Sequence, residues 1–321
     1  MKFSIILTID KNKNKNTLEK CLNSILKQTY KDFEIILLSD DSSIDINQIC
    51  KKYSEQYSDN IIYLRQKSVN SFVLKNLGIA YSTGDYILFS DKVDYYKHSA
   101  LKKISEKITL QKQIGRIEEN NTFTTIGRIV FDTVYELPEI IKFSSNLIGS
   151  KKNYLTGSGQ NYLLQCLNQN ESFDNISEYC FNKKFLSKNN LLFSLNTDES
   201  FIIKSLCLAK TCSVLNDELL INQKKIDSNL NQTDVELKIM RANELNTFLQ
   251  HNSVSKELQL NLKKQIFYTY YDNAFYCLDK YIVFKNKYLL KNMTTFKDFL
   301  KSIHLLLQLH TINLWEKYKP T

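Results

Sequence analysis

The sequence is poor in the two residues that most often interrupt regular structure. Its 321 residues include only 2 prolines and 7 glycines. Proline breaks helices and central strands, and glycine weakens the interior of both. An all-β protein needs many tight turns that depend on these residues. Their scarcity therefore favours long helices in a compact α/β body.

The sequence also lacks a long apolar segment. The N-terminus, MKFSIILTIDKNKNK, has only about seven apolar residues before polar ones follow, too few for a signal peptide with a cleavage site. No stretch reaches the roughly 18 apolar residues that cross a bilayer. Hydrophobic residues nevertheless make up 43% of the chain, enough for a substantial core. We therefore expect a folded cytoplasmic protein with one large domain, alone or with a helical appendage.

Cysteine and histidine are not arranged as metal or redox sites. The seven cysteines include no CxxC pair, so we expect reduced, mostly buried thiols. His304 and His310 are six residues apart, and His98 and His251 are isolated, so none belongs to a convincing ligand set.

The net charge of +9 comes from scattered lysines rather than from a recognisable nucleic-acid-binding module. Nucleotide sugars and anionic membrane surfaces would be attracted by the same charge. We expect most of it to be a solvated face, and no nucleic-acid partner.

Apolar runs alternate with amphipathic segments over the first hundred residues. This pattern predicts strands at 3–9, 33–39, 61–64 and 86–90, with helices at 17–28, 46–57 and 71–81 between them. Strands that are apolar on both faces and separated by helices predict a parallel sheet covered by helices on both sides.

Polar segments follow three of these strands: DKNKNKN the first, SDDSSID the second and SDKVDYY the fourth. Ligands of such sheets bind beyond the carboxyl ends of the strands. We therefore expect the three segments to meet at one edge and to form a binding site.

The rest of the chain is less regular until about residue 233, after which the pattern is helical. We predict a domain over 1–230 and a helical extension over 231–321. Other predicted elements are a helix at 99–112, a strand at 124–131, a helix at 198–210 and short strands at 212–215 and 218–222.

Two segments outside this pattern have open interpretations. The Gly/Ser/Asn-rich segment 146–161 contains GSG but no GK[ST], and no strand leads into it, so we expect a lid or connector rather than a phosphate loop. Residues 297–320 combine clustered Leu and Ile with Trp315 and flanking lysines. They form either a core-packing helix or an interfacial helix on a membrane.

Three segments together resemble the N-terminal half of a family 2 glycosyltransferase with the GT-A fold. They are SIILTID, LEKCLNSILKQTYKDFEIILLSDDSSID and VLKNLGIAYSTGDYILFSDKVD, within residues 3–110. A weaker match follows over 178–222, where KKFLSKNNLLFSLNTDESF resembles the segment with the acceptor-side acid. The resemblance implies a Rossmann-like, mainly parallel central sheet with helices on both faces. Its nucleotide-binding half would span about residues 1–110 and its acceptor half about 111–230.

The resemblance also implies an activity: inverting transfer of a sugar from a nucleotide-sugar donor, UDP-linked, to an acceptor hydroxyl. Mn²⁺ or Mg²⁺ would stabilise the diphosphate leaving group, and a carboxylate would take the proton of the hydroxyl. The implied setting is the synthesis of bacterial capsule, lipooligosaccharide or another surface glycan. The acceptor would be a glycan or a lipid-linked glycan, with peripheral contact at the cytoplasmic face of the inner membrane.

Site residues follow from the matched motifs. Asp40 and Asp41 match the paired aspartates that hold uracil or ribose, and Lys75 with Asn76 matches an Arg-Asn pair near the diphosphate. Thr8 and Asp10, at the end of the first strand, are further candidates for donor contact. The alternatives are a solvated loop with a helix cap at Asp41, and an ordinary surface lysine.

The acidic residues expected to take part in the reaction match the family's motifs only in part. Asp198 matches the base, although TDES is also an ordinary helix start. Asp91 and Asp94 match the first and third acids of the metal-binding motif, but Val93 stands where the usual metal ligand would be, and Thr197 replaces a glutamate. These departures leave a second hypothesis open, a weak or inactive GT-A homologue that serves as a binding or assembly partner. A nucleotidyltransferase would need a Gly-rich basic loop after the first strand, which is missing.

Overall fold

The computed structural model describes residues 1–9, 15–40, 44–67, 69–90, 94–120, 137–144, 157–173, 175–194, 197–222, 232–273, 295 and 301. The chain divides into two compact units, residues 1–225 and 226–321. The domain assignment made from the sequence, with its boundary at residue 230, stays a prediction.

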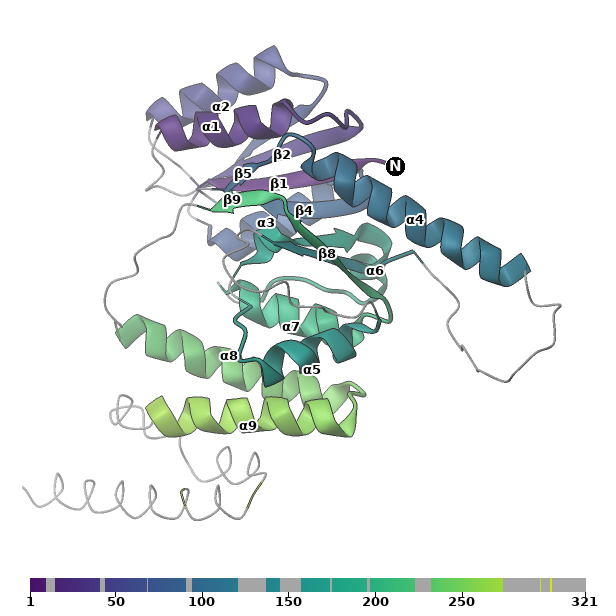
Figure 1. Cartoon of the computed structure of the whole chain (residues 1–321). Coiled ribbons are helices and arrows are strands. Elements are labelled where there is room, and N and C mark those ends of the chain that lie inside the picture. Colours follow the sequence, from purple (N-terminus) through teal and green to yellow (C-terminus); the bar gives the residue numbers. More distant parts are fainter. Residues whose placement is uncertain are drawn as a thin grey trace, which may run out of the picture. The chain divides into compact units, whose positions relative to one another are not determined.

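The first unit is built on a seven-stranded sheet with the order β3-β2-β1-β4-β7-β6-β8 (Figure 1). Strands β1 to β4 run parallel, β7 is antiparallel to both of its neighbours, and β8 is parallel to β6. The sheet is therefore mainly parallel, as predicted. The strands are β1 Phe3–Ile9, β2 Phe33–Ser39, β3 Ile61–Arg65, β4 Tyr86–Ser90, β6 Ile140–Ser144, β7 Tyr179–Asn182 and β8 Cys212–Glu218.

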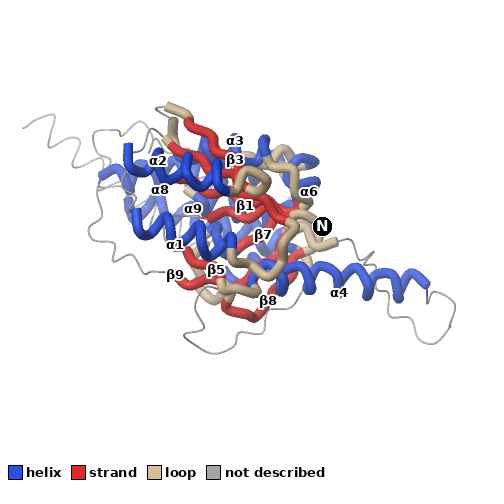
Figure 2. The backbone as a smooth tube through the Cα atoms, turned by 90° about the horizontal axis from the view of Figure 1, so that it is seen from above, coloured by secondary structure: helices blue, strands red, loops and turns tan. Residues whose placement is uncertain are grey.

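Helices cover both faces of this sheet, which explains why β1 and β2 are buried along their whole length. The odd-numbered hydrophobic residues of both strands form one core with residues of α1, α2 and α4. Figures 1 and 2 show these three helices beside the strands. Helix α3 packs on the opposite face. The helices of this unit are α1 Lys15–Leu26, α2 Ile44–Gln56, α3 Ser71–Tyr81, α4 Ala100–Asn120, α5 Gly159–Asn168, α6 Lys183–Lys188 and α7 Asp198–Leu208, with a 3₁₀ turn at Ile176–Glu178.

A glycine sets how closely α3 approaches the sheet. A Cβ atom at Gly78 would lie 2.4 Å from Cγ2 of Ile6 on β1. No side chain fits at this distance unless the Ile6 side chain, the helix or the strand moves. Gly78 therefore fixes the distance between α3 and the sheet, and with it the position of the polar residues on this helix.

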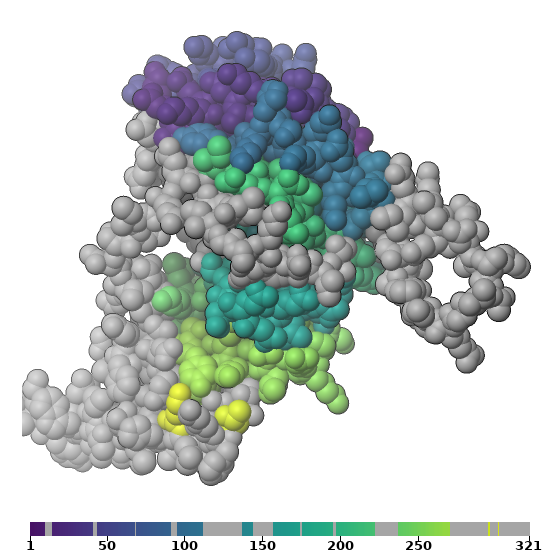
Figure 3. Space-filling view, viewed as in Figure 1, coloured from purple at the N-terminus to yellow at the C-terminus, as the bar shows by residue number. Residues whose placement is uncertain are grey.

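A second, small sheet joins segments that are far apart in the sequence. Strand β5 (Asp94–Tyr96) pairs antiparallel with β9 (Leu220–Asn222). In the space-filling view the purple α1, the blue β5–α4 segment and the green β8–β9 segment adjoin (Figure 3). Ion pairs of Lys97 with Glu218 and of Lys103 with Asp217 also connect the start of α4 to β8.

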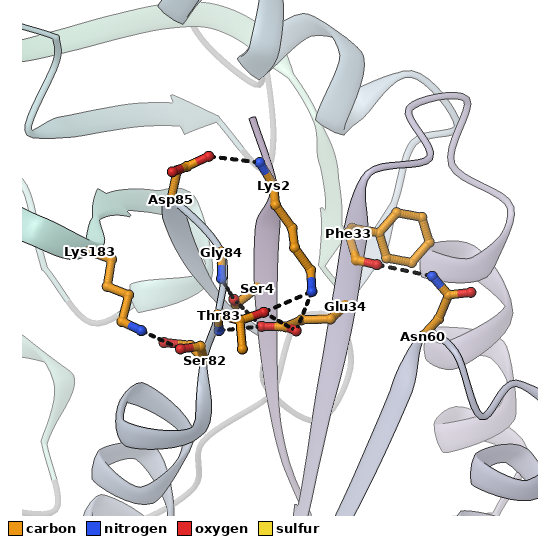
Figure 4. A network of polar contacts seen from close by, with 10 residues as sticks. All are labelled: Lys2, Ser4, Phe33, Glu34, Asn60, Ser82, Thr83, Gly84, Asp85 and Lys183. Atoms are coloured by element: carbon orange, nitrogen blue, oxygen red, sulfur yellow. Dashed lines mark hydrogen bonds and ion pairs between the residues drawn. The ribbon is translucent and has the colours of Figure 1, made fainter.

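A buried acid fastens the amino-terminal edge of the sheet (Figure 4). Glu34 of β2 accepts hydrogen bonds from Lys2 Nζ at 2.7 Å, from Ser4 Oγ at 2.6 Å, and from both the backbone N–H and the hydroxyl of Thr83 at 2.6 Å. Burial alone would raise the pKa of Glu34, but these hydrogen bonds outweigh it and lower the pKa to about 2. The network joins β1, β2 and the α3–β4 turn, so it fixes the strand register on which the opposite edge depends.

Most elements predicted in the first hundred residues are confirmed to within two residues. The short strands β5, β6 and β7 and the helices α5 and α6 were not predicted. The expectation of a lid or connector over 146–161 is wrong for residues 159–161, which begin α5. Ser158 Oγ accepts a hydrogen bond from the Asn161 N–H and caps this helix. The predicted strand at 124–131 and residues 145–156 lie outside the described residues, as does the segment 297–320 apart from Lys301.

All six cysteines in the described part of the chain are buried and form no disulfide. Burial raises the pKa of the Cys166 and Cys207 thiols to about 12, so they are inert at neutral pH. This confirms the prediction of buried thiols for these six residues.

In the second unit, the described helices α8 (Gln232–His251) and α9 (Lys256–Asn273) pack on each other. The side chains of Leu245 and Leu249 on α8 and of Leu258 and Leu262 on α9 are buried. None of the helices described in either unit is long and apolar enough to cross a membrane.

Candidate functional site

The carboxyl ends of three strands meet at one edge of the sheet, as the sequence predicted. Ile9 at the end of β1 is in register with Ser39 at the end of β2. On its other side, β1 pairs with β4 up to Leu7 opposite Ser90. The polar segments 10–14, 41–43 and 91–93 that follow these strands lie outside the described residues. The described part of the site therefore consists of the side chains that surround the strand ends.

Three polar side chains connect the end of β2 to the first turn of α2. The Tyr63 hydroxyl donates to Asn47 Oδ1 at 2.8 Å and lies 2.9 Å from Ser39 Oγ. Burial raises the pKa of Tyr63, and its hydrogen bond with Ser39 offsets part of this rise. The phenol therefore stays neutral and can act as a donor. These contacts fix the backbone immediately before Asp40.

Asp40 has an incomplete set of hydrogen bonds. Its Oδ1 atom is buried and has no hydrogen-bond partner within the described ranges. A buried carboxylate oxygen without a donor is costly, and such an atom in a folded protein needs an explanation. A ligand that brings an N–H or O–H group to the end of β2 would satisfy it. Uracil and ribose carry such donors, so this oxygen fits the nucleotide expected from the sequence.

Lys75 and Asp198 meet although 123 residues separate them. Lys75 Nζ donates to Asp198 Oδ1 at 2.5 Å, and the two side chains are 7% and 13% exposed. Lys75 lies in the second turn of α3, and Asp198 is the first residue of α7. The lysine Nζ also lies 5.4 Å from the centre of the Phe193 ring. The interpretation of Lys75 as an ordinary surface lysine is therefore wrong.

The start of α7 is not capped by the residue at its N-cap position. Thr197 occupies that position without a side-chain cap hydrogen bond, and its Oγ1 atom is buried with no partner in the described part of the chain. Ser200 Oγ, in the first turn, is also buried and unpartnered there. The positive end of this helix still favours a carboxylate in its first turn, where Asp198 and Glu199 lie.

Four phenylalanines pack beneath this pair and connect the strand ends to α7. The rings of Phe193 and Phe201 are stacked, with centroids 4.0 Å apart and planes 6° apart. Phe89, next to the last residue of β4, contacts both rings edge-on. Phe181 of β7 contacts Phe89 and Phe201 in the same way. The cluster forms a rigid support for the first turn of α7, where Asp198 lies, and connects it to the centre of the sheet.

The other candidates are placed only in part. Thr8 is buried on β1, one residue beyond the partner of Ser90. Asp94 begins β5 opposite Asn222, and its backbone alone is described. Asp10, Asp41 and Asp91 lie outside the described residues. Among the described residues there is no group of three side chains that could hold a metal ion.

The N-terminal part of the chain matches a known family. Residues 4–131 match the model of glycosyl transferase family 2. Glycosyltransferase GlyA of Streptococcus pneumoniae is 34% identical over 93 residues, which are 29% of this chain and 13% of GlyA. The putative glycosyltransferase EpsE of Bacillus subtilis is 32% identical over 119 residues, which are 36% of this chain and 40% of EpsE. The chain thus spans less than half the length of each of these relatives.

Similarity to solved structures extends over the whole fold. The S. aureus protein TarS, residues 1–349 in complex with UDP-GlcNAc, superimposes with a TM-score of 0.59 and 17% identity, covering 96% of this chain and 80% of that one. The mannosyltransferase PcManGT of Pyrobaculum calidifontis superimposes with a TM-score of 0.51 and 10% identity, covering 98% of this chain and 88% of that one. Residues 4–131 thus match glycosyl transferase family 2, and the sheet order together with these solved structures shows a GT-A-like fold.

Proposed function

We propose that this protein transfers a sugar from a UDP-linked donor to a hydroxyl of a glycan or lipid-linked glycan, by inverting displacement. The observation that carries the proposal is the buried ion pair of Lys75 and Asp198. The resemblance assigns these two residues to the diphosphate and to the base, and two distant segments bring them together. A chance match of motifs would not require this.

The pair suits the chemistry of displacement. An ionised carboxylate can accept the proton of an attacking hydroxyl, and the Lys75 ammonium group lies 2.5 Å from the carboxylate of Asp198. Lys75 also brings a cation to the site where the diphosphate leaving group gains charge. The two residues therefore serve the two ends of the reaction, proton removal and stabilisation of the leaving group.

Asp40, with Asp41, Asp10 and Thr8, would hold the nucleoside. The unpartnered Oδ1 of Asp40 supports this role, because uracil N3–H and the ribose hydroxyls are donors. TarS has been solved with UDP-GlcNAc, which supports a UDP-linked donor here.

Mn²⁺ or Mg²⁺ would be held by Asp91 and Asp94. Hard cations prefer carboxylate oxygen, so the chemistry of these two residues fits such an ion, whereas Val93 offers no ligand. When bound, the ion would neutralise charge on the diphosphate. PcManGT has been solved with GDP-Man and Mn²⁺, which supports a metal in the site.

A role in bacterial surface-glycan synthesis is part of the proposal. The minor teichoic acid biosynthesis protein GgaB of B. subtilis is 30% identical over 89 residues. Donors of this kind are made in the cytoplasm, so we propose that the chain works there, on acceptors at the inner membrane where these are lipid-linked.

Isothermal calorimetry with UDP, UDP-glucose, UDP-GlcNAc and GDP-mannose, with and without Mn²⁺, tests donor binding directly. We expect binding of a UDP species, weakened at least tenfold by Asp40→Ala. Asp59→Ala, which removes an exposed aspartate from the α2–β3 turn, serves as the matched control and should leave binding unchanged. A folded protein that binds none of these compounds would overturn the proposal.

The second candidate function is a weak or inactive homologue that binds a donor or an assembly partner. The feature that favours it is Thr197, which stands where the family has a glutamate and whose buried hydroxyl has no partner among the described residues. Such a protein would bind UDP but release none from UDP-sugars. Measurable turnover in the wild type that Asp198→Asn abolishes would exclude it.

A further inference from the structure

Asn76 makes two hydrogen bonds to one backbone residue far away in the sequence. Its Nδ2 donates to the Phe193 carbonyl at 2.8 Å, and the Phe193 N–H donates to Asn76 Oδ1 at 2.8 Å. An amide side chain that donates and accepts in this way replaces the pair of bonds that a neighbouring strand would make. The segment around Phe193 belongs to no strand, so Asn76 supplies the backbone bonds that a sheet would otherwise provide.

This contact lies close to the proposed base. Asn76 follows Lys75 on α3, and Phe193 precedes Asp198 by five residues. Two successive residues of one helix thus hold two points of the same segment, Asn76 through the backbone of Phe193 and Lys75 through the carboxylate of Asp198. A shift at either point changes the direction from which Asp198 faces the strand ends.

The Phe193 ring transmits the position of its backbone to α7. It stacks on Phe201, which lies three residues after Asp198 and so on the same face of the helix. Packed aromatic rings allow little sliding without loss of contact. Fixing Phe193 therefore fixes the first turn of α7, where Asp198 lies.

We propose that Asn76 is a positioning residue for Asp198: it clamps the backbone of Phe193 so that the carboxylate is held at the reaction centre. The inference rests on the proposed function, since it gives Asn76 a task in the same reaction. Misplacement of a catalytic group by about 1 Å can lower a rate about a hundredfold. Loss of the clamp should therefore affect turnover far more than donor binding.

The test compares Asn76→Ala with Asn60→Ala. Asn60 Nδ2 also donates to a phenylalanine carbonyl, that of Phe33 at 3.0 Å, but at the start of β2. The readouts are release of UDP from the UDP-sugars of the donor panel, the Kd for UDP by calorimetry, and amide exchange of the peptide covering residues 191–201. We expect Asn76→Ala to lower kcat 10- to 100-fold, to leave the Kd for UDP within threefold, and to speed exchange in that peptide. Asn60→Ala should leave all three readouts unchanged, even where it lowers Tm equally.

Two results would overturn the inference. One is Asn76→Ala with kcat within threefold of the wild type. The other is an unchanged rate of amide exchange over residues 191–201 in Asn76→Ala, because it would show that Asn76 does not restrain this segment. The exchange readout does not depend on the proposed function. If the wild type releases no UDP from any donor, the proposed function fails, and exchange alone decides whether Asn76 holds the segment.

Discussion

Lys75 Nζ lies 2.5 Å from Asp198 Oδ1, and both side chains are almost fully buried. Removing one partner takes the ion-pair partner from the other buried charge, which typically costs about 3 kcal/mol or more. We therefore expect Lys75→Met and Asp198→Asn each to lower the free energy of unfolding by about 3 kcal/mol. The double variant should lose clearly less than the sum of the two. Urea denaturation of the four proteins measures the coupling energy.

The ion pair of Lys103 and Asp217 is the matched control. It also joins distant segments, but its side chains are 41% and 40% exposed. Solvent screens such a pair, so its coupling energy should stay below about 1 kcal/mol. Equal coupling in the two pairs would mean that burial does not strengthen the pair of Lys75 with Asp198.

Glu34 should give the protein a defined sensitivity to acid. Its pKa is lowered from 4.5 to about 2 in the folded state. Between these values the unfolded state binds more protons, so stability falls as the pH drops from about 4.5 towards 2. In Glu34→Gln this part of the pH dependence should disappear, and stability at pH 7 should be about 2–4 kcal/mol lower. Denaturant unfolding from pH 7 to pH 3 measures both effects.

Glu55→Gln provides the comparison for Glu34. Glu55 is 67% exposed and pairs with Lys51 one helical turn away. We expect a change within about 0.5 kcal/mol at every pH. If both variants show the same acid profile, the network at the amino-terminal edge does not cause the sensitivity.

Gly78→Ala should destabilise the fold and disturb the site. The new Cβ atom would meet Ile6 at 2.4 Å, and relieving this overlap typically costs about 1–3 kcal/mol. Because Lys75 lies one turn earlier on the same helix, donor turnover should fall as well. Gly157→Ala is the matched control, since its Cβ would meet no atom closer than 4.0 Å. Thermal unfolding that ranks the two variants equally would contradict the close packing of α3.

Val93→Asp tests the proposed metal site by supplying the carboxylate that the family pattern has at this position and that this chain lacks. If Asp91 and Asp94 hold a metal weakly, a third carboxylate should raise Mn²⁺-dependent release of UDP by about tenfold. Val93→Asn, which has the same shape without the charge, should raise it less. An increase that persists in EDTA would show that the effect does not depend on a metal.

The sequence predicted the first hundred residues well because their signals are local. Strands such as 3–9 and 33–39 are apolar on both faces, and the helices between them have regular periodicity. The loops after parallel strands must then meet at one edge, so the position of the site follows from the order of strands and helices along the chain.

The second half of the first unit could not be predicted in the same way. Strands β6 and β7 are five and four residues long, and each is stabilised by partners far away in the sequence. Helix α5 begins in a segment whose glycines and serines are typical of a connector. The glycine at 159 is instead required because the helix start packs against the backbone of α7. A single sequence gives no sign of such contacts.

The same difference between local signals and long-range contacts applies to the candidate site residues. Motif matching identified Lys75 and Asp198 separately but could not show that they form a pair. The match of Asn76 to the family's Arg-Asn pair suggests a place near the diphosphate, but it gives no sign of the two hydrogen bonds to the backbone of Phe193. Pairing between segments more than a hundred residues apart is a property of the folded chain.

The central claim is that Asp198, held by Lys75, is the base of a sugar-transfer reaction. Its most direct test is UDP release from the best UDP-sugar of the donor panel by the wild type, Asp198→Asn and the control Asp217→Asn. The predicted result is a loss of kcat of at least a hundredfold in Asp198→Asn, with UDP binding retained and Asp217→Asn fully active. Turnover by Asp198→Asn within threefold of the wild type would contradict the claim.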